Sequence, residues 1–245
     1  MACKQSEEIK MMGGDLAMID LHSHVLPGID DGSRDPEMSQ KMLEMLAGQG
    51  VTAVMATPHF YAAAHNPEDF VKQRTEVIAR LQQTPIPVLA GAEVAYFDGM
   101  SRADVLPKLC LGDSRLLLVE MPYGPWTPRM IEEVCDLPML QGVIPVLAHV
   151  DRYRGQFTKY MPDFMQHGVL FQCNAEAFLN WRSRCWALEL LREGALHFLG
   201  SDCHNLTTRA PKMAQAAQVI TQKLGKEVLE DLTAFTAELL HLTDN

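Results

Sequence analysis

Short apolar runs alternate with stretches of helical spacing along nearly the whole chain. The runs predicted to be strands are almost free of charge and cover residues 17–21, 51–57, 87–94, 116–120, 144–149, 169–174 and 195–201. The stretches predicted to be helices cover residues 36–50, 67–83, 101–109, 128–140, 160–167, 181–193, 211–224 and 226–240. Strands that are apolar throughout are buried on both faces, as in a parallel sheet covered by helices. The pattern therefore predicts an α/β fold in which about seven parallel strands form a closed or nearly closed barrel.

The length of 245 residues suits one barrel domain, which we predict over residues 17–245 because no linker or repeat interrupts the alternation. Residues 1–16 carry Lys4, Glu7, Glu8 and Lys10 without an apolar segment. We therefore expect a flexible N-terminal extension there, not a signal peptide. Because no apolar run is long enough to span a bilayer, we expect a cytoplasmic protein without membrane insertion.

Charge and cysteine content narrow the classes of partner. The formal net charge is −10 with no basic run, which argues against binding to nucleic acid or to an anionic membrane. It does not exclude a phosphorylated substrate, since bound metal ions can invert the local field. The six cysteines form no C-x-x-C pair, so we expect reduced thiols in the core.

Two histidines one residue apart, His22 and His24, follow the first predicted strand. Residues i and i+2 of a strand point to the same side, so both imidazoles are expected to aim at one point. Two converging imidazoles suit zinc, manganese or iron. By itself this short motif is only weak evidence for a metal.

Further ionisable residues fall at the ends of other predicted strands, where the active sites of parallel α/β barrels are built. They are His59, Glu93, Glu120, His149, Asp202 and His204. Burying such groups unpaired is costly, and a shared set of metal ions would satisfy all of them. Asp30 and Asp31 compete as one further ligand. The remaining candidates, His65, His167, His197 and His241, do not fall at strand ends, and we expect them to lie outside the site.

Several motifs together resemble the polymerase-and-histidinol-phosphatase (PHP) superfamily. They are D-L-H-S-H-x-L-P-G-I-D-D-G-S, A-T-P-H, G-x-E-V, L-V-E-M-P, A-H-V-D-R-Y and G-S-D-C-H-N. Within the superfamily, the chain from about Met18 onward is similar to bacterial manganese-dependent protein-tyrosine phosphatases found with capsule and exopolysaccharide genes. The resemblance implies a distorted (βα)7 TIM-like barrel with three divalent metal ions at the C-terminal ends of the strands.

The resemblance also assigns roles to individual residues. It implies a first metal held by His22, His24, Glu93 and Asp202, a second held by Glu93, Glu120 and His149, and a third held by Asp31, His59 and His204. Arg152 and Arg209 match arginines that hold the substrate phosphate. The chain departs from the family at Val150–Asp151, where Pro-Glu is common, and in the loop Tyr61-Ala62-Ala63-Ala64, which is less polar than expected.

The function expected from this resemblance is metal-dependent hydrolysis of phosphotyrosine in a protein, with manganese as the expected metal and iron or zinc as alternatives. The expected partner is an autophosphorylating bacterial tyrosine kinase. Two alternatives stay open: a small-metabolite phosphatase of the histidinol-phosphate type, and a non-catalytic regulatory domain stabilised by metals. An exonuclease fits less well, because the chain has no basic stripe.

A second phosphatase chemistry has a formal match in the sequence. Cys203 and Arg209 have the C-x5-R spacing of cysteine-dependent tyrosine phosphatases. That chemistry needs a thiolate under converging backbone N–H groups, in a loop that is usually glycine-rich. No glycine lies between Cys203 and Arg209, and Asp202 and His204 are proposed ligands on either side of the cysteine. We therefore expect Cys203 to pack away from the metals.

Overall fold

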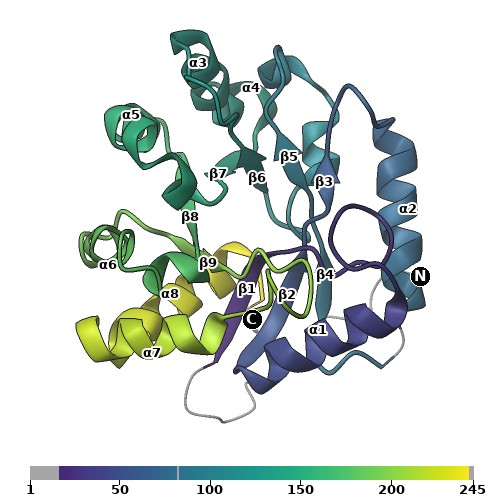
Figure 1. Ribbon diagram of the computed structural model, residues 1–245. Coiled ribbons are helices and arrows are strands. Elements are labelled where there is room, and N and C mark those ends of the chain that lie inside the picture. The colour runs from purple at the N-terminus through teal and green to yellow at the C-terminus, as the bar shows by residue number, and fades with distance from the viewer. Residues whose placement is uncertain (1–16, 82, 243–245) are drawn as a thin grey trace.

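The computed structural model describes residues 17–81 and 83–242, so the extension predicted for residues 1–16 lies outside the described residues. Its strands are β1 (Met18–Ser23), β2 (Val51–Ala56), β3 (His59–Phe60), β4 (Val88–Ala90), β5 (Glu93–Ala95), β6 (Leu116–Glu120), β7 (Ile144–Leu147), β8 (Leu170–Asn174) and β9 (Phe198–Gly200). Every recorded strand pair is parallel. The strand orders are β1-β2-β4 and β3-β5-β6-β7-β8-β9, and a bridge from Ser23 to Cys203 brings the chain after β9 back beside β1. The strands therefore form a curled parallel sheet (Figure 1).

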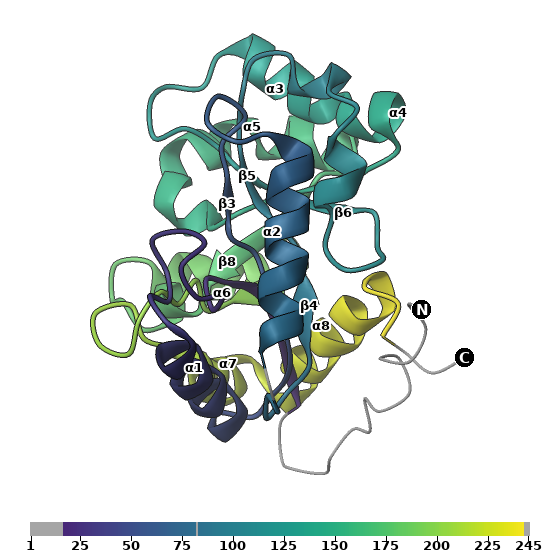
Figure 2. The same ribbon diagram turned by 90° about the vertical axis from the view of Figure 1, so that its right-hand side faces the viewer.

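Helices surround this sheet on its outer side (Figure 1). They are α1 (Pro36–Gly48), α2 (Pro67–Arg80), α3 (Pro128–Cys135), α4 (Leu137–Gln141), α5 (Arg154–Gln166), α6 (Arg184–Arg192), α7 (Met213–Leu224) and α8 (Lys226–Leu239). Short 3-10 helices are η1 (Met100–Arg102), η2 (Leu106–Leu109), η3 (Val150–Tyr153) and η4 (Ala175–Phe178). Figure 2 shows α2 running lengthwise along one side of the molecule. Among the described helices, none combines the length and apolar character needed to cross a bilayer.

Local sequence explains where the first two helices begin. Asp35 caps α1 by accepting a hydrogen bond from the Met38 N–H at 2.8 Å, and Pro36 occupies the first turn. Asn66 caps α2 in the same way, accepting from the N–H groups of Glu68 and Asp69. These caps satisfy backbone donors that a helix start leaves without partners.

Most predicted elements are present, but several differ in detail. The strand predicted over 87–94 is interrupted at Gly91, whose carbonyl accepts a hydrogen bond from the buried Arg74 guanidinium at 2.6 Å. The helix predicted over 101–109 is two 3-10 helices, and the one predicted over 128–140 is α3 and α4, separated at Asp136 just before Leu137-Pro138. The helix predicted over 160–167 begins earlier, at Arg154. The parallel, curled sheet is confirmed, whereas a count of seven strands is not.

Two apolar clusters cover the two faces of the sheet. The larger cluster packs the outer helices against the sheet, whereas the smaller one contains Leu21, Met55, Leu118 and Phe198 and is joined by Leu240 after α8. Along β6, Leu116 and Leu118 belong to the smaller cluster and Leu117 and Val119 to the larger one. This alternation puts Glu120 on the side of the smaller cluster, at the C-terminal end of the strand.

Candidate metal centre

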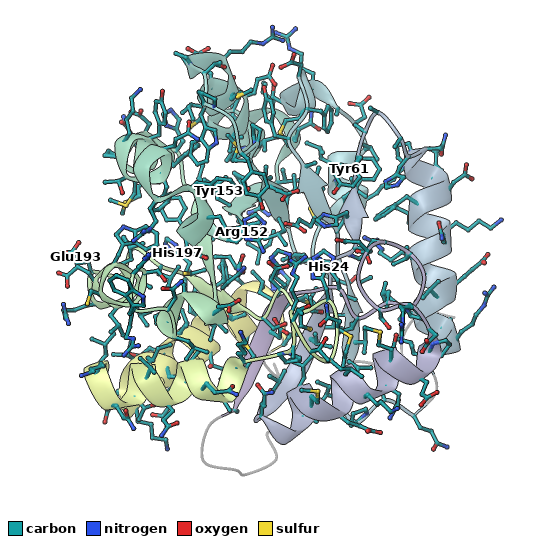
Figure 3. All side chains as sticks on the ribbon, in the orientation of Figure 1. His24, Tyr61, Arg152, Tyr153, Glu193 and His197 are labelled. Carbon is teal, nitrogen blue, oxygen red and sulfur yellow. The ribbon has the colours of Figure 1, made fainter. Side chains whose placement is uncertain are left out.

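The residues predicted to bind metal all lie in one cluster. Most of them end or follow a strand, but Glu93, predicted near the end of a strand over 87–94, instead begins β5, and His59 begins β3. Contacts within 4 Å connect His22, His24, Asp31, His59, Glu93, Glu120, His149, Asp202 and His204. In Figure 3, His24 and Arg152 lie near the middle of the ring of elements, whereas Tyr61 lies toward β3 and His197 lies toward α6. Residues separated by up to 182 positions therefore form one centre (His22 to His204).

Glu93, at the start of β5, lies at the middle of the centre and is 1% exposed. Its Oε2 is 3.2 Å from Nε2 of both His22 and His24 and 3.0 Å from Nδ1 of His59. Its Oε1 is 2.8 Å from Nε2 of His149. Burial alone would raise the pKa of Glu93, but the facing His22 and His149 side chains hold it well below its usual range. Glu93 therefore stays ionised although it is buried.

Three overlapping groups of side chains each bring their ligand atoms within 4.8 Å of one another: His22, His24 and Glu93; His59, Glu93 and Glu120; and His24, Asp31, His59 and His204. The Nε2 atoms of His22 and His24 are 3.1 Å apart. Two nitrogens bound to one ion at about 2.1 Å would be separated by about 3.0 to 3.4 Å for bond angles near 90° to 109°. The spacing of these two nitrogens fits a shared ion.

Some buried atoms of the centre also lack a hydrogen bond of good geometry within the described residues. They include Glu93 Oε2, His59 Nδ1 and His204 Nε2. Buried polar atoms normally have such a partner, and leaving one without it is costly. Divalent cations in the groups that contain Glu93 and His204 would give these atoms partners, so the donor set fits metal on physical grounds.

The two aspartates that competed in the sequence have different places. Asp30 Oδ2 is 2.7 Å from Nδ1 of His24 and accepts a hydrogen bond from the His59 N–H at 3.1 Å. Asp31 Oδ1 instead lies 3.5 Å from His59 Nε2 and 3.4 Å from His204 Nε2. Asp31 therefore faces the centre, and Asp30 supports His24 from behind. The turn between these aspartates and α1 needs Gly32, because a Cβ there would lie 2.3 Å from the His24 carbonyl oxygen.

The Asp30 contact also fixes the state of His24. Burial opposes the charged imidazole, but the hydrogen bonds to Asp30 and Glu93 raise the pKa of His24 to about 10. When a cation takes the place of the second proton, an Nδ1–H donated to Asp30 leaves the Nε2 lone pair directed at the centre. Carboxylates paired with the far nitrogen of a histidine ligand are a common way to orient it.

Two residues of β8, Gln172 and Asn174, hold the proposed metal ligands in place. The sequence motifs did not identify them. Gln172 Oε1 accepts a hydrogen bond from the His149 N–H at 2.6 Å and lies 3.2 Å from His22 Nδ1. Gln172 Nε2 donates to Asn174 Oδ1 at 3.0 Å, and Asn174 Nδ2 donates to Asp202 Oδ2 at 2.9 Å. The available signal was two amide side chains at i and i+2 in an otherwise apolar strand.

Backbone strain also falls at the centre. His149 and Asp202 have φ values of 32° and 49°, in the left-handed region that residues other than glycine rarely adopt. His149 lies two positions after the end of β7, and Asp202 lies two positions after the end of β9. Both side chains contact the cluster. Strain of this kind persists only where the surroundings hold the residue firmly, and it is common at functional sites.

The two predicted phosphate-binding arginines lie beside the cluster and share one partner. Arg152 Nη2 donates to Asp202 Oδ2, and Arg209 Nη2 donates to Asp202 Oδ1 at 2.7 Å. Burial would raise the pKa of Asp202, but the charges of His22 and Arg152 hold it below its usual range. The guanidinium side chains are 28% and 37% exposed, so an anion from solvent can reach both.

The histidines that were expected to lie outside the site have other partners. His65 Nδ1 accepts a hydrogen bond from the Tyr61 N–H, and His197 Nδ1 accepts one from the Phe171 N–H. His167 Nδ1 lies 2.8 Å from the carbonyl oxygen of Asp163. His241 follows α8, away from the strand ends that carry the cluster.

Cys203 packs in the core, as predicted. Its side chain is buried in the larger apolar cluster, and burial raises the pKa of its thiol far above neutral. A protonated, inaccessible thiol cannot attack phosphorus. The described cysteines, Cys110, Cys135, Cys173, Cys185 and Cys203, are all free thiols.

Comparisons with known proteins identify the family of the chain. A family model described as capsular polysaccharide synthesis, CpsB/CapC, matches residues 18–240. The chain is 30% identical over 236 residues to the tyrosine-protein phosphatase YwqE of Bacillus subtilis, and the match covers 91% of each chain. It is 27% identical over 234 residues to the tyrosine-protein phosphatase CpsB of Streptococcus pneumoniae, covering 88% of this chain and 94% of CpsB.

Solved structures of related proteins share the fold of this chain. A structure from work on YwqE and CpsB, described there as unique metal-dependent tyrosine phosphatases, matches with a TM-score of 0.80 at 27% identity over 93% of this chain and 96% of the other. Histidinol phosphate phosphatase of Lactococcus lactis matches with a TM-score of 0.52 at 13% identity over 84% of this chain and 93% of its own, which shows a shared fold alone. The chain belongs to the CpsB/CapC family of capsular polysaccharide synthesis.

Proposed function

We propose that this protein is a metal-dependent protein-tyrosine phosphatase. The observation that carries the proposal is the convergence of imidazoles and carboxylates around Glu93, with Arg152 and Arg209 beside them. Relatives named tyrosine-protein phosphatases support the same activity over about nine-tenths of the chain, at 91% coverage for YwqE. The proposal includes a single (βα)7-type barrel domain that holds the centre at its C-terminal face.

Three divalent ions, manganese by preference and iron or zinc as alternatives, are proposed for the centre. The proposed ligand sets are His22, His24, Glu93 and Asp202 for the first; Glu93, Glu120 and His149 for the second; and Asp31, His59 and His204 for the third. The His59 ring faces two of these sets, because its Nδ1 is 3.0 Å from Glu93 and its Nε2 is 3.5 Å from Asp31. Bound ions of this kind lower the pKa of water and neutralise phosphate charge.

With three divalent ions bound, the centre would keep a net positive charge and attract anions, because its proposed ligand sets contain only four carboxylates. Six positive charges from three divalent ions exceed the four negative charges of the ligands by about two. The guanidinium groups of Arg152 and Arg209 add to this field and can hold phosphate oxygens in a fixed orientation. Both are anchored to Asp202 and so stay close to the cluster. A phenolate leaving group, with a pKa of about 10, departs more readily than an alkoxide.

The proposed substrate is an autophosphorylated bacterial tyrosine kinase involved in capsule or exopolysaccharide regulation, and the proposed location is the cytoplasm. The family description supports a role in capsular polysaccharide synthesis. The negative net charge of −10 argues against nucleic acid as the substrate.

The proposal is tested by stripping the protein of metal and measuring phosphate release from a phosphotyrosine peptide and from histidinol phosphate, with and without added Mn²⁺. Manganese-dependent release from the peptide supports the proposal, whereas release from histidinol phosphate alone assigns a metabolite as substrate. Activity that survives full chelation contradicts metal dependence.

A His59→Ala variant separates catalysis from a purely structural role for the metals. Loss of hydrolysis with the fold intact by circular dichroism supports a catalytic centre. If the wild-type protein binds metal tightly but hydrolyses neither substrate, the domain is regulatory and the proposal is wrong.

A further inference from the structure

The apolar loop Tyr61-Ala62-Ala63-Ala64 adjoins the metal centre. Tyr61 directly follows β3, is 42% exposed, and stacks on the His59 ring with centroids 5.4 Å apart and an interplanar angle of 25°. The three alanines after it are also exposed. A large aromatic side chain is therefore open to solvent while its ring stacks on a residue of the centre.

The position of Tyr61 is fixed by its backbone. The Tyr61 carbonyl accepts hydrogen bonds from the N–H groups of Ala64 and His65 at 2.9 Å each, and the Tyr61 N–H donates to His65 Nδ1 at 3.1 Å. His65 itself stacks on Phe70 of α2 with centroids 5.5 Å apart. His65, expected to lie outside the site, thus holds the loop that presents Tyr61.

A second exposed tyrosine lies on another side of the centre. Tyr123 follows Glu120 by three residues, is 69% exposed, and accepts a hydrogen bond from Arg152 Nη1 at 3.2 Å. Its ring packs on Tyr153 with centroids 5.5 Å apart. The turn after it is also held in place, because Gln156 Nε2 donates to the Gly124 carbonyl at 2.9 Å.

These two tyrosines differ from exposed aromatic residues found singly on most surfaces, which need no explanation. Each touches a different residue of the proposed machinery, His59 in one case and Arg152 in the other. Each is also carried by a loop with side-chain hydrogen bonds that fix its backbone. Because β5 lies between β3 and β6 in the sheet, the loops that carry them approach the centre from separate strand ends.

We propose that Tyr61 and Tyr123 form aromatic walls that receive the ring of a phosphotyrosyl side chain, so that the site prefers aryl to alkyl phosphomonoesters. This rests on the proposed phosphatase function and adds the residues that select its substrate class. A phosphate held by the arginines leaves its organic group directed toward the exposed rim. Aromatic rings there favour a second ring by offset or edge-to-face packing, which an alkyl group cannot reproduce.

The test uses inhibitors that are not hydrolysed, so that leaving-group chemistry does not enter. Inhibition constants for phenylphosphonate, methylphosphonate and inorganic phosphate are measured with the manganese-loaded protein. Tyr61→Ala and Tyr123→Ala should each raise the constant for phenylphosphonate by about 3- to 10-fold, the range expected for one aromatic pair. The constants for methylphosphonate and phosphate should change by less than about twofold, within the precision of such comparisons.

Two controls sharpen the test. Tyr61→Phe and Tyr123→Phe keep the rings and should bind phenylphosphonate as the wild type does. Trp181→Ala removes an aromatic residue that is 75% exposed and whose recorded ring contact is with Arg182, and it should change none of the three constants.

Two results would overturn the inference. Equal weakening of all three inhibitors in Tyr123→Ala and Tyr123→Phe would make that tyrosine a positioning residue for Arg152 only. Unchanged phenylphosphonate binding in Tyr61→Ala and Tyr123→Ala would show that these two tyrosines do not contact the aromatic ring of the substrate. In both cases the wild type should still hydrolyse phenyl phosphate when manganese is added. If the proposed function itself is wrong, the wild type does not hydrolyse phenyl phosphate at all.

Discussion

The buried floor of the site and its exposed rim are built in different ways. The floor consists of His22, His24, Glu93, His149 and Asp202, whereas the rim consists of Asp31, Tyr61, Tyr123 and Arg209. Glu93 and His149 are 1% and 0% exposed, but the Asp31 side chain is 65% exposed and Tyr123 is 69% exposed. Contacts between side chains fix the floor, whereas hydrogen bonds between the backbone and the side chains of His65 and Gln156 fix the loops of the rim that carry Tyr61 and Tyr123. We infer that the floor sets the chemistry and the rim sets the choice of substrate.

Replacing the central carboxylate should have the largest effect on the floor. Glu93→Gln removes the charge that faces four imidazoles, so metal binding should fail and hydrolysis should fall by at least about a thousandfold, equivalent to about 4 kcal/mol. Manganese titration and phosphate release measure both effects. Glu176→Gln, an exposed glutamate paired with Lys212, is the matched control and should behave as the wild type. A Glu93→Gln protein that keeps full activity would show that hydrolysis does not depend on the floor.

A smaller effect is expected from the support behind the floor. Asp30→Ala takes away the partner of His24 Nδ1 but no atom that faces the centre. Manganese affinity should fall by about 10- to 100-fold, as for other residues that orient metal ligands. Asp113→Ala, an exposed loop substitution, provides the reference for isothermal titration. Unchanged affinity in Asp30→Ala would show that the His24 orientation does not depend on Asp30.

A histidine outside the site is expected to make the free energy of unfolding depend on pH. Burial lowers the pKa of His197, which lies away from floor and rim, to about 4 from its ordinary value of 6.5. The unfolded chain takes up this proton below pH 6.5 and the folded chain does not until about pH 4, so the stabilising contribution is complete above pH 6.5 and is lost as pH falls toward 4. The loss between pH 7.5 and 4.5 should be about 2 kcal/mol.

Urea unfolding of the wild type and of His197→Gln at several pH values measures this contribution. The difference between the two proteins should shrink as the pH falls, because glutamine does not titrate. A difference that is independent of pH would mean that His197 is not held neutral by burial.

The smallest effect is expected at Cys203. Cys203→Ala should leave manganese-dependent hydrolysis within about twofold of the wild type, since the thiol is buried, protonated and directed into the core. Steady-state assays and modification with iodoacetamide before assay provide the measurement. Strong inactivation by alkylation of Cys203 in the folded protein would restore the cysteine mechanism.

The floor could be predicted from the sequence because strand ends in a parallel sheet must meet. His22, His149 and Asp202 each follow or end an apolar run, and that position alone brought them to one face. The i, i+2 spacing of His22 and His24 likewise led to two nitrogens 3.1 Å apart.

What could not be predicted depends on contacts between distant residues. Asp30 and Asp31 are neighbouring and chemically alike, yet Asp30 pairs with His24 Nδ1, whereas Asp31 lies beside the imidazoles of His59 and His204. Gln172 is 150 residues from His22, so no local pattern pairs them. Where the predicted strand is interrupted, Arg74 of α2 donates to the Gly91 carbonyl, a contact between residues 17 positions apart. Local propensity contains none of this information.

The most direct test of the account is a single titration of metal-stripped protein with Mn²⁺, in which bound manganese and hydrolysis of a phosphotyrosine peptide are measured in the same samples. The account predicts that activity is absent without metal, rises together with the occupancy of tight sites, and is lost again on chelation. Full activity in protein with less than a tenth of an equivalent of bound metal would contradict it.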